Sequence, residues 1–319
     1  MHLDFQNRGS DGLGQQVNGR MMTMATPLIT SRDPKGLHAI GLFEAAYNKA
    51  GLDTVGAQRL NERGGEFQDG VIRLIAELSV SDRYADEEVE SGYGYLSGYT
   101  PKSLAEQISR LHELFPNLGG VDPAYLAKVE SGAIPLPAGA EGWFTIPRWE
   151  KVASLYGEAV EQILALINTA REGQFTNWRE GELGPDRLRQ TARSIAFWQK
   201  ISDEQSGADI LIVAGQFGKR HAGKSVRRGR EVYTPSEFGL GSFAVGVMLL
   251  THSERLLDYN DLWIDCGGDE YDDPGSFVRF GRAPYFHFGD GGVGFGTREV
   301  GGTDDYCGSA SAFLPQSGS

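Results

Sequence analysis

The spacing of apolar residues changes near residue 205, and this change constrains the fold more than any other feature of the chain. Before it, apolar side chains recur at helical spacing, as at Leu104, Ile108 and Leu111. After it, short apolar runs such as 210–214 alternate with glycine, proline and aspartate turns, which is typical of strands. We therefore predict an α+β or mixed α/β protein whose helical N-terminal part packs on a smaller C-terminal sheet.

Four parts of the chain follow from these patterns. Asp33 and Pro34 are typical of a helix start, so the polar residues before them are expected to form a flexible tail. The expected parts are this tail at 1–31, a mainly helical region at 32–204, an α/β glycine-rich region at 205–314 and a loose tail at 315–319. We expect the longest helix at 148–172, further helices at 185–200 and 236–257, and short strands at 262–264, 277–280, 285–288 and 293–295.

The composition argues against several classes of protein. The 30 Lys and Arg residues against 43 Asp and Glu residues give a formal charge of −13, which disfavours broad coating of nucleic acid. Cys266 and Cys307 are too few for a disulfide framework, although one bridge is compatible with the sequence, and they suit the reducing cytoplasm. The longest apolar run, 238–250, is shorter than the roughly 20 residues that span a membrane. We therefore expect a soluble cytoplasmic protein that does not contact a membrane.

One segment, Gly218–Arg230, concentrates positive charge in this acidic chain, and we call it the basic segment. It contains no acidic residue. Its six permanent cations are Lys219, Arg220, Lys224, Arg227, Arg228 and Arg230. Because like charges repel, these side chains need an anionic ligand or carboxylates of the same protein beside them. The basic segment is therefore either a site for a phosphate-bearing ligand, nucleic acid or acidic protein, or a solvated loop paired with acidic surface.

Within the basic segment, residues 218–225 spell G-x-x-x-x-G-K-S, which resembles the Walker A motif of P-loop nucleotide hydrolases. In that motif backbone N–H groups wrap the phosphate chain, the lysine neutralises the terminal phosphates and the hydroxyl holds Mg²⁺. The resemblance implies these roles for Lys224 and Ser225, with Asp265 on the metal and with nucleotide and Mg²⁺ as cofactors. Two features depart from the motif, because residues 215–217 lengthen the loop and Gly229 leaves room for only a short helix.

A second charged segment, residues 265–273, directly follows the expected strand at 262–264, and we call it the acidic segment. It contains five carboxylates, Asp265, Asp269, Glu270, Asp272 and Asp273. Clustered carboxylate oxygens can hold Mg²⁺ or Ca²⁺, so Asp265, Asp269 and Glu270 are candidate metal ligands. A pair of carboxylates could also act in acid–base chemistry if burial separated their pKa values. The alternative is a solvated acidic turn.

The order of strand, helix and strand at 210–214, 236–257 and 262–264 matches a βαβ unit. If the two strands are parallel neighbours, the basic and acidic segments both follow carboxyl ends of strands and meet at one edge, where ligands bind in open α/β sheets. The two segments would then either neutralise each other or share a metal–phosphate ligand. The argument fails if the strands are antiparallel or belong to separate sheets.

Four stretches of the chain resemble a family of uncharacterised bacterial proteins. They are SGYGYLSGYTPKSL (91–104), AEGWFTIPRWEKV (140–152), EFGLGSFAVGVMLLTH (237–252) and DLWIDCGGDEY (261–271). The resemblance would cover most of the chain after the tail. It implies no activity and assigns no catalytic residue.

Three functions remain open from the sequence. The first is a binding protein that engages a phosphate-bearing or acidic partner through the basic segment. The second is a P-loop-like nucleotide hydrolase, with Lys224 on phosphate and with Ser225 and Asp265 on Mg²⁺. The third is a structural or assembly protein, such as a homo-oligomer, whose charged segments form subunit contacts. The direction of the backbone N–H groups at 218–225 distinguishes among them, because a P-loop aims them at one point.

Overall fold

The computed structural model describes residues 30–79 and 81–315. The expected tails at 1–31 and 315–319 fall almost entirely outside these residues. The chain divides into two compact units, Met1–Leu74 and Ile75–Ser319. This boundary differs from the expected one near residue 204, because a strand at Gly142–Pro147 pairs with the strand at Ile210–Gln216 and so ties both sides of that position into one unit.

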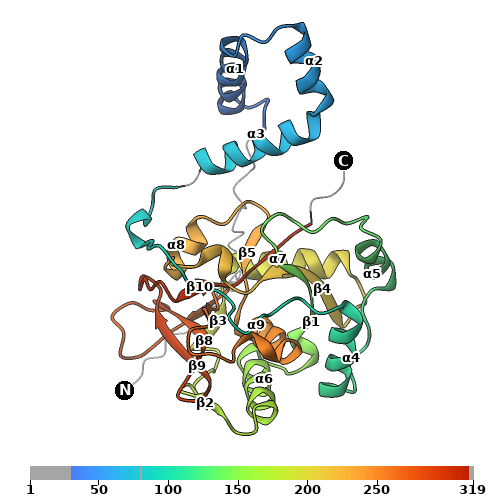
Figure 1. Ribbon diagram of the computed structural model, residues 1–319. Helices are drawn as coiled ribbons and strands as arrows, with labels where there is room; N and C mark the ends of the chain where they lie inside the picture. The colour runs from blue at the N-terminus through green and yellow to red at the C-terminus, as the bar shows by residue number, and fades with distance from the viewer. Residues whose placement is uncertain (1–29, 80, 316–319) are drawn as a thin grey trace, which may run out of the picture. The chain divides into compact units, whose positions relative to one another are not determined.

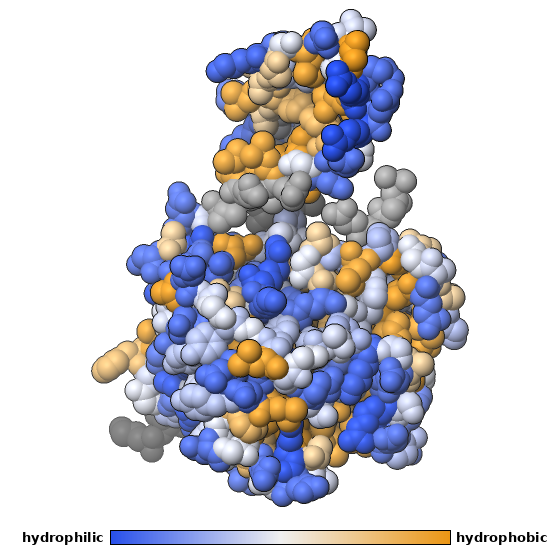
Figure 2. Space-filling model, in the orientation of Figure 1, coloured by the Kyte–Doolittle hydropathy of each residue, from blue (hydrophilic) through white to orange (hydrophobic). Residues whose placement is uncertain are grey.

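The first unit is helical in its described part and exposes many apolar side chains (Figures 1 and 2). Its helices are α1 (Pro34–Lys49), α2 (Thr54–Glu62) and α3 (Gly64–Leu78), of which α3 runs past the boundary between the units. Neither α1 nor α2 contains a buried residue. Phe43 and Phe67 pack together, with ring centroids 6.0 Å apart. The expected helix start at Pro34 is confirmed.

The second unit contains two sheets (Figure 1). The first sheet is antiparallel and has the order β1 (Gly142–Pro147), β4 (Ile210–Gln216), β11 (Ser311–Phe313), β5 (Glu237–Gly239). The second contains β10 (Cys307–Ser309), β6 (Trp263–Asp265), β8 (Arg282–Gly289), β7 (Asp269–Tyr271) and β3 (Leu188–Gln190) in that order, with β9 (Gly292–Glu299) joining β8 to β2 (Phe175–Asn177). All seven residues of β4 are buried, as its continuous apolar run predicts.

The two sheets meet at Ala310, and we call this place the seam. Strands β10 and β11 are separated by Ala310 alone, yet they belong to different sheets. The N–H of Ala310 donates to the carbonyl of Asp265, and its carbonyl accepts from the N–H of Leu240. One residue is therefore bonded to both sheets, and the candidate site described below is built around it.

Helices cover the sheets, and the core lies between them. The helices of the second unit are α4 (Leu104–Leu114), α5 (Pro123–Glu130), α6 (Tyr156–Ala170), α7 (Ala192–Glu204), α8 (Val226–Glu231) and α9 (Ser242–Thr251), with short 3₁₀ turns η1 (Ala85–Glu87), η2 (Trp149–Lys151), η3 (Lys219–His221) and η4 (Ser253–Arg255). Every residue of α9 is buried, and α9 packs against α6. Across residues 30–79 and 81–315, the helices are too short or too polar to cross a membrane.

The α+β class is confirmed, but several expected elements are wrong. The expected helix at 148–172 begins only at Tyr156, because Arg148 continues from β1 and its N–H bonds to the carbonyl of Asp209. In the expected helix at 185–200, residues 188–190 form β3 and Thr191 caps the helix that follows. Residues 277–280 form no strand. The expected helix at 236–257 opens instead with β5.

The expected βαβ unit is also wrong. Strands β4 and β6 lie in different sheets, and the parallel neighbour of β6 is β10. The physical reason is that β11 occupies the place beside β4, where it pairs antiparallel and satisfies the backbone groups that a parallel β6 would need.

Candidate functional site

A short acidic stretch covers the basic segment. Residues 87–89, which we call the strap, lie along residues 223–225 with two backbone hydrogen bonds, from Val89 N–H to the Gly223 carbonyl at 2.8 Å and from Ser225 N–H to the Glu87 carbonyl at 3.1 Å. Gly223 has a φ of 76°, and a Cβ there would lie 2.0 Å from the carbonyl oxygen of Val89. Glycine at this position is therefore required for the strap to dock.

The two carboxylates of the strap neutralise much of the basic segment. Arg227 Nε lies 2.8 Å from both oxygens of Glu87, and Ser225 Oγ donates to the same carboxylate at 2.6 Å. The hydrogen bond from Arg227 lowers the pKa of Glu87. Glu88 pairs with Lys224, at 3.1 Å between Nζ and Oε2, and accepts a hydrogen bond from Arg228. Three of the six cations are thus paired with carboxylates of the strap.

The backbone N–H groups of residues 218–225 donate to scattered acceptors of the protein. Gly218 N–H donates to Gln216 Oε1 at 2.5 Å, Lys219 N–H to the hydroxyl of Tyr95 at 3.1 Å, and Gly223 N–H to the carbonyl of Cys307 at 2.9 Å. The following helix, α8, has only six residues, and Ser225 caps it. A P-loop instead aims these groups at one phosphate chain. The nucleotide-hydrolase interpretation therefore gains no support from this geometry.

The remaining cations of the basic segment have other neighbours. Lys219 Nζ lies 5.9 Å from the ring centroid of Tyr95. Arg220 Nε lies 3.1 Å from Glu237 Oε1. Arg230 donates to two carbonyls of the acidic segment, with Nε 2.9 Å from the Gly267 oxygen and Nη2 2.6 Å from the Asp269 oxygen. The two charged segments therefore do lie side by side, although the strand pairing that predicted it is absent.

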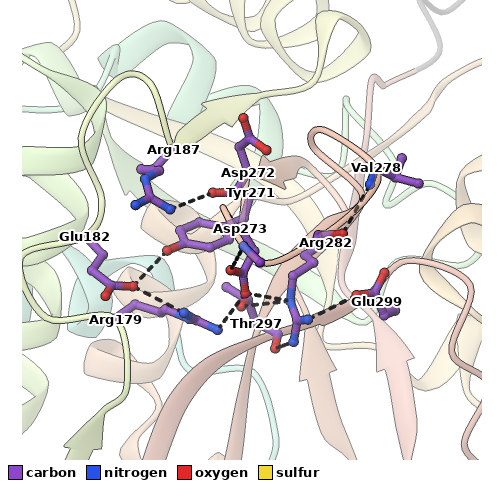
Figure 3. A network of polar contacts seen from close by, with 12 residues as sticks. Arg179, Glu182, Arg187, Tyr271, Asp272, Asp273, Val278, Arg282, Thr297 and Glu299 are labelled. Carbon is purple, nitrogen blue, oxygen red and sulfur yellow. Dashed lines mark hydrogen bonds and ion pairs between the residues drawn. The ribbon is translucent and has the colours of Figure 1, made fainter.

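Three carboxylates of the acidic segment are paired with arginines from outside the basic segment, and Figure 3 shows the pairs of Asp273. Arg179 and Arg282 lie 3.4 Å and 3.7 Å from Asp273 Oδ2. Asp272 pairs with Arg279 at 2.9 Å, and Glu270 with Arg189 at 2.8 Å. Neutralisation of the basic segment by the acidic segment was one of two arrangements that the sequence left open, and these pairs show that the side chains do not adopt it. Contact between the segments runs through backbone carbonyls instead.

The three candidate metal ligands serve different purposes. Asp269 accepts from the N–H of Ser242 at 2.6 Å and from the hydroxyl of Tyr156 at 2.9 Å, so it caps α9. Glu270 faces Arg189, and Asp265 is buried on β6. Within the described ranges, His, Cys, Asp and Glu side chains form no group of three or more that could hold a metal ion. The structure does not bring these carboxylates together.

Five buried polar side chains gather at the seam, and we call them the polar centre. They are His221, Tyr233, Glu237, Asp265 and Ser309. Ser309 on β10 and Asp265 on β6 are register partners on parallel strands, so their side chains lie on the same face. The rings of His221 and Tyr233 are 5.1 Å apart, and His221 Nε2 lies 2.7 Å from Glu237 Oε1. The basic segment, β5 and the second sheet thus each contribute to one cluster.

Gly267 joins the two halves of the polar centre. A Cβ on Gly267 would lie 2.6 Å from the hydroxyl of Tyr233 and 3.5 Å from Ser309 Oγ. Both hydroxyls therefore lie against the same glycine, and a larger residue would separate them. Arg230 holds the carbonyl of this glycine at 2.9 Å. Through this contact a half-buried cation of the basic segment takes part in the centre.

Four members of the polar centre carry polar atoms with no hydrogen-bond partner among the described residues. These atoms are His221 Nδ1, the Tyr233 hydroxyl, Ser309 Oγ and both carboxylate oxygens of Asp265. Arg298 Nη1 lies 3.7 Å from Asp265 Oδ2, too far for a hydrogen bond. Buried polar groups are nearly always hydrogen-bonded, to protein or to a bound molecule. Four exceptions in one place mark a candidate binding site.

The fifth member, Glu237, is held firmly. Ser311 Oγ donates to Glu237 Oε1 at 2.7 Å, and Gln216 Nε2 donates to Ser311 Oγ at 2.8 Å. Burial by itself would raise the pKa of Glu237, but the hydrogen bond and charge of His221, with Arg220 and Ser311, outweigh it and hold the pKa at about 2. Glu237 therefore stays ionised and orients the ring of His221, leaving Nδ1 on the other side of the ring.

Asp265 has the opposite electrostatic environment. Burial raises its pKa to about 6, with Arg298 and Arg230 partly offsetting the increase and Asp304 adding to it. Two carboxylates of one cluster are thus separated in pKa, which is the pattern that places a proton acceptor and a proton donor together. Chemically, the centre offers an ionised carboxylate, an imidazole, two hydroxyls and a carboxyl group that can carry a proton near neutral pH.

Sequence reasoning found part of this cluster for other reasons. Asp265 was assigned to a metal, and His221 lies within the basic segment without a role of its own. Tyr233, Glu237 and Ser309 were missed. One signal was available, since Ser309 and Ser311 place hydroxyls at alternate positions of an otherwise small and apolar run. Cys266 and Cys307 are both free and buried, so the optional bridge is not formed.

Comparison of the chain with protein-family models, with curated proteins and with solved structures finds no match in any of the three. The resemblance to an uncharacterised bacterial family stays a prediction.

Proposed function

We propose that this protein binds a small, uncharged, hydroxyl-bearing molecule at the polar centre. The observation that carries the proposal is the set of four buried side chains, His221, Tyr233, Asp265 and Ser309, whose polar atoms find no partner in the described part of the chain. Leaving a buried polar group unpaired costs about 1–3 kcal/mol. A ligand that satisfies several of these groups would recover that free energy on binding.

The kinds of group at the centre favour an uncharged ligand. Hydroxyls and imidazole both donate and accept, whereas Asp265 accepts when ionised and donates when protonated. The nearby cations are already bonded, Arg220 to Glu237, Arg230 to backbone carbonyls and Arg298 to Asp304. An anion would therefore meet the charge of Glu237 without a free cation to offset it. A ligand whose hydroxyls both donate and accept matches this set best.

We expect a ligand to reach the centre beside Tyr233, because this residue is its most exposed member, at 8%, and lies on the segment between α8 and β5. We expect the ligand to bind when this segment moves. Binding would then be slower than diffusion allows, since the chain has to open first.

Thermal unfolding with a panel of glycerol, myo-inositol, glucose, galactose and mannose tests the proposal. A specific ligand raises Tm because it binds the folded chain alone. High concentrations of polyols stabilise most proteins, so the comparison is between variants. We expect at least one compound to raise the Tm of the wild-type protein more than that of Ser309→Ala and Asp265→Asn. The control Ser276→Ala changes a serine outside the centre and should behave as wild type.

Equal shifts for the wild-type protein, Ser309→Ala and Asp265→Asn across the whole panel would contradict the proposal. The fluorescence of the five tryptophans gives a second, independent readout of binding. A compound that binds with the same affinity to all three proteins occupies another site.

The functions expected from the basic segment stay predictions with less support. A phosphate-bearing ligand, nucleic acid or acidic protein would have to compete with Glu87 and Glu88 for Lys224, Arg227 and Arg228. Such binding would weaken steeply with salt. The nucleotide-hydrolase function also stays a prediction with less support. It predicts that Mg²⁺ with ATP or GTP raises the Tm of the protein.

An assembly role is supported by a different observation. Large apolar side chains of the first unit are exposed, among them Leu42 at 61% and Val55 at 59%. Patches of this kind often mark interaction surfaces. Light scattering of the full chain would show a defined homo-oligomer if this role holds.

A cytoplasmic setting also stays a prediction, and the two free thiols agree with it.

A further inference from the structure

A row of aromatic rings lies on the same face of the second sheet as Asp265 and Ser309. Side chains alternate along a strand, so Trp263, two residues before Asp265 on β6, shares its face. Tyr285 is the register partner of Asp265 on β8, and His287 follows on the same face. The row continues to Trp178 after β2 and to Tyr306 before β10. We call Trp178, His287, Tyr285, Trp263 and Tyr306 the aromatic row.

The rings of the aromatic row are in contact from one end to the other. Ring centroids are 5.2 Å apart between Trp178 and His287, 5.4 Å between His287 and Tyr285, 5.5 Å between Tyr285 and Trp263, and 4.7 Å between Trp263 and Tyr306. The planes of Trp263 and Tyr285 differ by 1°. Gly294 on β9 has no side chain, and a Cβ there would lie 2.3 Å from His287 and 2.5 Å from Trp178. The rings therefore lie close against a bare stretch of strand.

The aromatic row is accessible, whereas the opposite face of the sheet is core. Trp178 is 49% exposed, Trp263, Tyr285 and Tyr306 are half-buried, and His287 between them is buried. On the other face, Phe286 and Phe295 are fully buried in the main core. Contiguous aromatic rings that stay partly exposed often mark a binding surface, and they suit a ligand that stacks on flat rings.

We propose that the aromatic row binds the sugar rings of a neutral oligosaccharide. The C–H groups on one face of a pyranose carry partial positive charge and lie well against the negative face of an aromatic ring. Charge disfavours nucleic acid, the other common stacking ligand, because the chain carries −13 overall and exposed Asp290 and Asp305 lie on the loops that border the row. A neutral glycan stacks without this repulsion.

The aromatic row leads to the polar centre, which gives the oligosaccharide a direction. Trp263 and Asp265 are separated by one residue of β6 and Tyr285 is the register partner of Asp265, so this part of the row lies next to the carboxyl group of the centre. A sugar ring stacked at Trp263 would place its hydroxyls toward Asp265 and Ser309. This inference deepens the proposed function and rests on it for that last step only, because stacking on the row does not need the polar centre.

Tryptophan fluorescence and calorimetry with cellohexaose, maltohexaose, chitohexaose and a dodecamer of thymidylate test the row. We expect one hexasaccharide to bind, and Trp178→Ala and Tyr285→Ala to weaken its binding about tenfold each, the usual effect of losing one stacking ring. Trp178 is half exposed, so its removal leaves the core intact. Phe277→Ala, which removes a fully exposed aromatic ring from another loop, is the matched control and should leave affinity unchanged.

The outcomes separate this inference from the proposed function. Weakening by Trp178→Ala with unchanged binding in Ser309→Ala would support the row and count against the polar centre. If monosaccharide binding depends on Ser309 but hexasaccharide binding is the same in Trp178→Ala, the aromatic row is not the oligosaccharide site. The proposal for the polar centre would then still hold. Absence of binding by all three hexasaccharides, or binding of the dodecamer in their place, would also overturn the proposal for the row.

Discussion

Polar side chains are paired at the strap and partly unpaired at the polar centre, although residues of the basic segment take part in both. At the strap, Arg227, Arg228 and Lys224 each face a carboxylate of the same chain. At the polar centre, His221 and Ser309 leave polar atoms without partners among the described residues. The densest run of positive charge in the sequence is thus largely paired with carboxylates of the same chain. The candidate site is made instead of residues that lie far apart in the sequence.

The difference has an energetic meaning. Ion pairs and hydrogen bonds at the strap contribute to stability, and a missing partner there would be costly. Unpaired groups at the centre reduce stability, which a fold tolerates where function requires it. The two regions should therefore respond in opposite directions when their polar groups are removed.

Removing the carboxylates of the strap should have the largest effect. In the variant Glu87→Ala with Glu88→Ala, the mostly buried guanidinium of Arg228 and the buried hydroxyl of Ser225 lose their carboxylate partners. We expect the free energy of unfolding to fall by about 3 kcal/mol, the usual cost of stranding a buried charge. Urea unfolding followed by circular dichroism measures it.

The control for the strap is the variant Asp86→Ala with Glu90→Ala. It removes the same charge from two exposed neighbours, and we expect a change within about 0.5 kcal/mol. If both double variants lose the same stability, net charge and not pairing decides the effect, and the contrast between the strap and the polar centre disappears.

The second prediction concerns the pH dependence of stability at Asp265. Its pKa is raised from 3.8 to about 6 in the folded chain, so the folded state binds the proton more tightly than the unfolded state does. The neutral carboxyl group therefore favours folding at low pH, and this advantage is lost as pH rises from about 4 to about 6. At pH 7.5 the ionised, buried carboxylate destabilises the protein.

Asp265→Asn keeps the shape and removes the charge. We expect it to stabilise the protein at pH 7.5 by on the order of 2 kcal/mol and to have little effect at pH 4. Urea unfolding of both proteins from pH 4 to pH 8 measures the difference. A gap that stays constant with pH, or that grows toward low pH, would show that Asp265 has a partner that favours its ionised form.

Local signals predicted the fold better than they predicted the candidate site. The capping residues of α4 and the buried run of β4 are readable from the sequence, because each depends on neighbours within a few positions. Pairing of β11 with β4 joins residues about a hundred positions apart, and no local pattern encodes it. The βαβ prediction failed for this reason.

The candidate site shows the same limit more strongly. The sequence predicted that carboxylates could lie beside the basic segment, and it pointed to residues 265–273. In the structure Glu87 and Glu88 take this place. These two residues look unremarkable among the many carboxylates of the chain. Ser309 and Tyr233 come together only because Gly267 lets both hydroxyls approach, and that closeness depends on the complete packing of the seam.

The smallest expected effect comes from two serines at the seam that differ only in their partners. Ser311 Oγ donates to Glu237 at 2.7 Å and accepts from Gln216 at 2.8 Å, whereas Ser309 Oγ has no partner in the described residues. Ser311→Ala should lower the free energy of unfolding by about 1–2 kcal/mol, and Ser309→Ala should leave it unchanged or raise it slightly. Urea unfolding of the two variants side by side measures both. An equal loss in the two variants would mean that Ser309 is already bonded, and the polar centre would then resemble the strap.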